Sequence, residues 1–218
     1  MSRDAVLVIA CGALAHDLVR VKTLNQWDQI EIQCLPAELH NEPQKIPGAV
    51  RDKIHENKGK YRDIFIGYSD CGTGGLLDAV IREEEVERLP GAHCYEMFSG
   101  EAGFSQLHES EPGTFYLTDF LARHFDRLVI KGLGLDRFPE LKEMYFTHYR
   151  KLVYLAQIDD VTIDQKAREA AKFLGLEYQR IKTGDEFLES ALSVRIGTTR
   201  SRQVAHQDSR NDATDSEP

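Results

Sequence analysis

The sequence predicts an α/β domain of three layers, in which helices cover both faces of a mainly parallel sheet. Apolar runs of strand length alternate along most of the chain with stretches in which apolar residues recur at helical spacing. Some of these runs are apolar at every position, as in AVLVIA at 5–10 and LVYLA at 152–156. Continuous apolar strands are typical of parallel sheets, because helices bury such strands on both faces.

The first half of the chain is expected to contain three strands and three helices in alternation. Pro36 closes the second strand, and Pro47 with Gly48 marks the start of the second helix. Pro90 and Gly91 end the third helix. We predict strands at 5–11, 30–36 and 63–68, and helices at 12–24, 46–61 and 76–89.

The second half is expected to continue the same alternation after a less regular segment at 92–113. That segment is expected to begin with a short strand and to continue as a loop or short helix. Thr118 is a suitable N-cap, and Gly175 occupies the usual stop position of a helix. We predict strands at 114–117, 151–158 and 177–184, and helices from 118 or 119 onwards, at 159–176 and at 185–192.

Length and composition favour a single folded unit with a polar end. The chain has 218 residues, of which 41% are hydrophobic, and this suits one α/β domain over 1–196. The last segment, 197–218, has almost no large apolar residues and is expected to be disordered.

Charge and hydropathy exclude several classes of partner. The formal net charge of -9 repels phosphate backbones, so nucleic acid is not an expected partner. No apolar run approaches the ~20 residues that span a bilayer. The N-terminus lacks a basic segment before its apolar run and is interpreted as a strand. A cytoplasmic protein is therefore expected, in which the four cysteines are thiols or ligands rather than disulfides.

Three of the cysteines lie where parallel α/β proteins bind ligands. Cys11 ends the first predicted strand, Cys71 follows the third, and Cys94 lies beside His93 in the irregular segment. If these loops meet at one edge of the sheet, three thiols and an imidazole converge there. A cysteine alone is more often a core residue, and this is the interpretation we favour for Cys34, which lies inside a predicted strand.

Glycines accompany two of these cysteines and allow the backbone to approach a bound group. They are Gly12, Gly72, Gly74 and Gly75. The last three precede a predicted helix, so phosphate or another small anion is an alternative ligand for this loop. The dinucleotide and nucleoside-triphosphate patterns are both incomplete, since Leu77 stands where the third glycine is required and no Gly-Lys-Ser/Thr follows.

The chain resembles the DUF1638 family of uncharacterised bacterial and archaeal proteins. The resemblance rests on IACGAL, GYSDCGTGGL, AHCYEMFSG and EPGTFYLT, and it covers most of residues 5–190. The family has no established activity, but its members often accompany genes for corrinoid-dependent methyltransferases. The resemblance therefore implies a setting in methylamine or glycine betaine one-carbon metabolism, with a corrinoid protein or methyltransferase as a partner.

These observations together predict a metal site formed by Cys11, Cys71, Cys94 and His93. Three thiolates with one imidazole suit zinc, and three thiolates with an open corner would also suit a [4Fe-4S] cluster. The expected function is a metal-dependent enzyme, such as a methyl-group transferase, or an accessory protein that acts on a small-molecule substrate. The alternative is a non-catalytic module that binds a corrinoid protein or a small anion through the glycine-rich loops.

Overall fold

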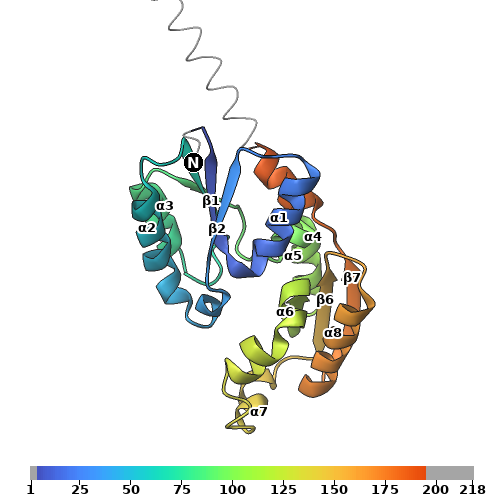
Figure 1. The fold of residues 1–218 in the computed structure, drawn as a ribbon. Helices are drawn as coiled ribbons and strands as arrows, with labels where there is room; N and C mark the ends of the chain where they lie inside the picture. Colours follow the sequence, from blue (N-terminus) through green and yellow to red (C-terminus); the bar gives the residue numbers. More distant parts are fainter. Residues whose placement is uncertain (1–3, 195–218) are drawn as a thin grey trace, which may run out of the picture.

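The computed structural model describes residues 4–194, which form a mixed α/β structure with two parallel sheets flanked by helices (Figure 1). The predicted α/β class with mainly parallel strands is confirmed. The strands are nevertheless divided between a sheet of four and a sheet of three, which the alternation of elements alone did not indicate. The tail predicted at 197–218 lies outside the described residues. No helix within 4–194 combines the length and the apolar character that crossing a membrane requires.

The first sheet has the strand order β2-β1-β3-β4. Its central strand β1 is buried along its whole length, as its continuous apolar sequence requires. Helices α2 and α3 pack on one face of this sheet, and α1 packs on the other together with helical residues 186–194. The bounds are β1 (Val6–Cys11), β2 (Ile30–Leu35), β3 (Asp63–Gly67), β4 (Glu87–Arg88), α1 (Ala15–Leu24), α2 (Ile46–Asn57) and α3 (Leu76–Glu83).

The second sheet has the order β5-β6-β7, with α6 and α8 on one face. Helix α5 and the segment before α4 cover the other face through aromatic and aliphatic side chains. Thr118 and Gly175 act as predicted, the first as the N-cap of α6 and the second as the left-handed end of α8. The bounds are β5 (Thr114–Thr118), β6 (Lys151–Ala156), β7 (Glu177–Lys182), α4 (Glu96–Ser99), α5 (Glu101–Ser110), α6 (Asp119–Arg123), α7 (Leu141–Phe146) and α8 (Val161–Leu174).

Two local predictions were wrong. The helix predicted at 76–89 ends at Glu83, because Glu85 adopts a positive φ of 54° and β4 then pairs with β3. The short strand expected near 92 is absent from the described chain, where α4 and α5 form instead. The helix predicted from 118 or 119 onwards begins at Asp119 as expected, is interrupted after Arg123, and is followed by a π-helix at Asp126–Lys131.

Candidate metal centre

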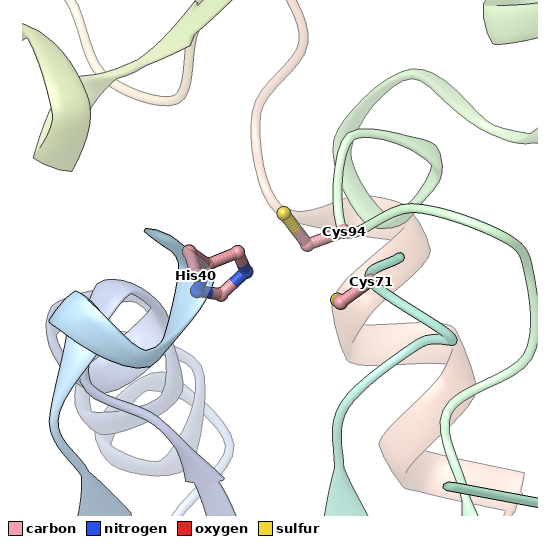
Figure 2. Close-up of side chains that lie close together, drawn as sticks. All are labelled: His40, Cys71 and Cys94. Carbon is pink, nitrogen blue, oxygen red and sulfur yellow. The ribbon is translucent and has the colours of Figure 1, made fainter. Parts of the chain in front are cut away.

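Three side chains from separate segments converge at the carboxyl end of the first sheet. His40 lies on the 3-10 helix η2 (Ala37–Asn41), which follows β2; Cys71 lies in the turn after β3; and Cys94 follows β4. One ring nitrogen of His40 and the two sulfurs all lie within 4.8 Å of one another. Figure 2 shows the imidazole facing both thiols. These three residues, named here the His-Cys-Cys group, form a possible metal-binding group.

Cys11 lies beside the His-Cys-Cys group without belonging to it. Its Sγ is 3.4 Å from Nδ1 of His40 and accepts a hydrogen bond from the Ala13 amide at 3.3 Å. Because Nδ1 is turned to Cys11, Nε2 is the nitrogen that remains to face the two thiols (Figure 2). The ring of Tyr68 stacks on the imidazole with an interplanar angle of 17°, which helps to fix its plane. Cys11 and Tyr68 therefore position His40.

Backbone hydrogen bonds join the segments that carry the two thiols. The Cys71 amide donates to the Ala92 carbonyl at 2.9 Å, and the Asp70 amide donates to the Gly91 carbonyl at 3.2 Å. These bonds lie two or three residues from Cys94, so they hold the two thiol-bearing loops side by side. The backbone of Cys71 itself has a positive φ of 51°, a conformation that is uncommon outside glycine. A positive φ at a residue other than glycine costs free energy, and it persists only where the surrounding structure holds the backbone in place.

The Asp70 carboxylate fixes the turn that carries Cys71. It accepts hydrogen bonds from the Thr73 hydroxyl at 2.6 Å and from the amides of Gly74 and Gly75 at 3.1 and 2.9 Å. Although partial burial raises the pKa of Asp70, these hydrogen bonds outweigh it and lower the pKa below its ordinary value. The glycine-rich turn is thus organised around a carboxylate of the same chain.

We expect Asp70→Ala to destabilise the protein by about 1–3 kcal/mol, because it leaves polar groups of the turn without their acceptor. Urea denaturation at neutral pH measures the difference. Since the pKa of Asp70 is lowered, its contribution is present above the ordinary carboxyl pKa and is lost as the pH falls below it. The difference in unfolding free energy between the variant and the parent should therefore become smaller in acid. Asp28→Ala, at an exposed loop carboxylate, is the control; an equal loss in both variants would contradict this role.

The pKa values of the three side chains in the His-Cys-Cys group are shifted strongly from their ordinary values. A hydrogen bond from Cys94 lowers the pKa of Cys71 to about 5, against the opposing effect of burial and with further help from His40. The same hydrogen bond, and then burial, raise the pKa of Cys94 well above its ordinary value. Burial disfavours charge on His40, but its hydrogen bonds to the sulfurs of Cys11 and Cys71 outweigh burial and raise its pKa to about 10. At neutral pH the metal-free group therefore contains a Cys71 thiolate facing an imidazolium.

A pocket of about 250 Å³ opens beside the His-Cys-Cys group, between the two sheets. His40 and Cys94 form part of its wall from the first half of the chain, and β5 with the segments that follow it contributes the rest of the second-half lining. Most of the lining is apolar or aromatic. The full lining comprises Ala13, Ala37, His40, Asn41, Cys94, Tyr95, Phe115, Thr118, Phe120, Leu121, Leu128, Val129 and Leu133.

The structure brings together two of the four residues predicted from sequence as ligands, Cys71 and Cys94. Cys11 is adjacent through His40. His93 does not belong to the group, and its ring packs against Tyr95 and Phe104 at centroid distances of 6.4 and 5.9 Å. The histidine of the group is His40, which the sequence interpretation missed. It follows β2 much as Cys71 follows β3, so the strand-end rule applied to β2 points to this loop without singling out His40 within it.

The prediction that Cys34 is packed in the core was wrong, because this residue is exposed. It lies on β2, the edge strand of the first sheet, in register with Ala10 of β1. An edge strand has a neighbour on one side alone, so fewer side chains can cover it. Its exposure makes Cys34 a suitable control thiol for experiments on the other three cysteines.

The predicted binding glycines have structural roles in the turns that carry them. The amides of Gly74 and Gly75 are bonded to Asp70, which leaves them less available for an anion. Gly72, Gly74 and Gly75 all have positive φ, and the turn needs glycine there for that reason. At Gly12 a Cβ atom would approach the Leu35 carbonyl oxygen to 3.1 Å, so this glycine permits the close approach of the chain after β1 to the end of β2.

One family model matches the chain over residues 34–192, and its description is "Protein of unknown function (DUF1638)". The matched range contains His40, Cys71 and Cys94, while Cys11 precedes it. No curated protein and no solved structure matches the chain.

Proposed function

Because the chain belongs to the DUF1638 family, whose description assigns no activity, we propose a function from the site itself. We propose that the protein binds one zinc ion through His40, Cys71 and Cys94 and presents an open coordination position to a small-molecule substrate. The observation that supports this most directly is the convergence of one nitrogen and two sulfurs within 4.8 Å. An imidazole with two thiolates is a known ligand set of catalytic zinc, which keeps its fourth position for water or substrate.

The distances favour one ion over a cluster. Two sulfurs that each lie ~2.3 Å from a tetrahedral zinc are about 3.8 Å apart, so the limit of 4.8 Å is close to the spacing that one zinc ion requires. An iron–sulfur cluster distributes its cysteine ligands over different irons and is usually held by thiolates alone. The His-Cys-Cys group offers two thiols and an imidazole, which makes the cluster the weaker alternative.

The pocket supports a substrate role for the site rather than a structural one. Structural zinc is enclosed by four protein ligands. Here His40 and Cys94 belong both to the His-Cys-Cys group and to the pocket wall, so a fourth ligand would enter from the pocket. Pockets with an apolar lining and a few convergent polar groups are typical of small-molecule sites.

The proposed setting is methyl-group metabolism linked to corrinoid-dependent methyltransferases, as the family resemblance implied. A bound zinc would supply Lewis acidity and would favour the deprotonated form of a thiol or water that binds to it. The chain's own residues would hold this position: Cys11 orients the imidazole, and Asp70 holds the turn of Cys71. A binding module without chemistry is the second candidate, although the amides it would use at Gly74 and Gly75 are bonded to Asp70.

Metal analysis of protein purified without oxygen tests this proposal. We expect colourless protein with about one zinc per chain, which a chelator removes and added zinc restores. Cobalt substitution should give the intense blue-green absorption of a tetrahedral thiolate site. A brown protein with iron and sulfide would support the cluster instead, and protein that takes up neither metal would contradict a metal centre altogether.

A further inference from the structure

The pocket beside the His-Cys-Cys group also restricts the chemistry of its ligand. None of its lining residues is a lysine, arginine, aspartate or glutamate. A separate pocket of about 160 Å³ is lined mainly by charged side chains, and Phe120 lines both pockets. That second pocket is lined by His16, Asp17, Arg20, Asp119, Phe120 and Arg123. In the zinc-loaded site His40 is neutral and the charge of the Cys94 thiolate is offset by the ion, so a charged ligand in the first pocket would have no uncompensated opposite side-chain charge in contact with it.

The polar groups that remain in the pocket are few and already partly engaged. The Asn41 amide donates to the Leu128 carbonyl at 3.3 Å, and the Thr118 hydroxyl accepts from the Leu121 amide at 3.4 Å. The Tyr95 hydroxyl donates to the Tyr116 carbonyl at 3.4 Å. Burying a charge without a partner is far more costly than burying an apolar group. The pocket therefore favours ligands whose body is apolar.

The net charge of the proposed metal site also favours an uncharged ligand. A zinc ion with two thiolates and a neutral imidazole has no net charge, so the loaded site would not offset a charged substituent elsewhere on the ligand. A volume of about 250 Å³ holds roughly eight non-hydrogen atoms, given that one water takes about 30 Å³ of liquid.

We infer that the substrate is a small molecule with an uncharged, mainly apolar body and one oxygen or sulfur donor that binds the metal. This inference rests on the proposed function, since the donor needs a metal in the His-Cys-Cys group. The apolar body lies against the wall formed by Phe115, Phe120, Leu121, Leu128 and Leu133.

Thiols with the same donor and different tails test the inference. Cobalt-loaded protein is titrated with propanethiol and its charged isostere cysteamine, and with isopentanethiol and its charged isostere mercaptopropionate. Affinities are read from the cobalt spectrum and expressed for the thiolate form of each compound. We expect each apolar thiol to bind at least about tenfold more tightly than its charged isostere. Affinity should also rise about fourfold for each methylene added until the pocket is full.

A negative charge placed in the pocket should reduce this preference for the apolar thiol over cysteamine. Leu133→Asp should weaken both apolar thiols and strengthen cysteamine relative to propanethiol by about threefold to tenfold. Ile130→Asp is the matched control, because Ile130 is also half-buried but lines a separate groove beside α8. Cobalt uptake with equal affinity for all four thiols would overturn the inference and leave the metal site standing. Protein that binds no cobalt would overturn the proposed function, and the inference with it.

Discussion

Serine in place of Cys71 or Cys94 is expected to weaken zinc binding by roughly a hundredfold to a thousandfold. Apparent binding free energies of about 10–16 kcal/mol for structural zinc, shared among four ligands, correspond to about 2.5–4 kcal/mol per ligand. His40→Ala should weaken zinc binding by a similar factor, because the imidazole supplies the nitrogen of the His-Cys-Cys group. Competition with a chromophoric chelator measures the dissociation constants.

The other two cysteines provide graded controls for this prediction. Cys11→Ser should weaken binding by about tenfold to a hundredfold, as is typical when a residue that orients a metal-binding histidine is removed. The sulfur-to-cobalt absorption should keep its intensity in that variant and fall by about half in Cys71→Ser and Cys94→Ser. Cys34→Ser should bind like the parent, because Cys34 is exposed and does not belong to the group. Equal losses in all four variants would indicate general destabilisation instead of coordination.

The sequence predicted the positions of the thiols because strand ends are local features. Continuous apolar runs identified β1 and β3, and parallel strands place their carboxyl ends at one edge of a sheet. This reasoning placed Cys71 at the sheet edge where the His-Cys-Cys group lies. Cys94 was harder to place, because its segment is irregular and its position depends on backbone bonds to the turn of Cys71.

The features that sequence reasoning missed depend on contacts between distant segments. His40 comes from a 3-10 helix, which has no apolar periodicity to reveal it. His93 is adjacent to Cys94 in sequence, but its ring packs against aromatic neighbours, including Phe104 of α5. The division into two sheets likewise follows from which strands pair, and alternating elements are compatible with either arrangement. The pocket that results from this division could not be located from the sequence.

Zinc binding is expected to release about two protons per ion at every pH between about 6 and 9. In the metal-free protein His40 has a pKa of about 10 and Cys94 a pKa well above its ordinary value, so each holds one proton across this range. Cys71, with a pKa of about 5, holds none. Because binding competes with the two remaining protons, affinity should rise about a hundredfold per pH unit over the range. Below pH ~5, Cys71 is also protonated, and the count should approach three.

A proton count that stays constant with pH distinguishes a thiolate–imidazolium pair from side chains with ordinary pKa values. One histidine and two cysteines with ordinary pKa values of about 6.5 and 8.5 would release nearly three protons at pH ~6 and fewer than one at pH ~9. Calorimetric titrations with zinc in buffers of different ionisation enthalpy measure the count directly. His40→Gln should lower it to about one at neutral pH, since the imidazolium proton is then absent, whereas Cys34→Ser should leave it unchanged. A count that falls steadily from pH ~6 to pH ~9 in the parent protein would show that the thiolate and imidazolium of the metal-free site are not paired.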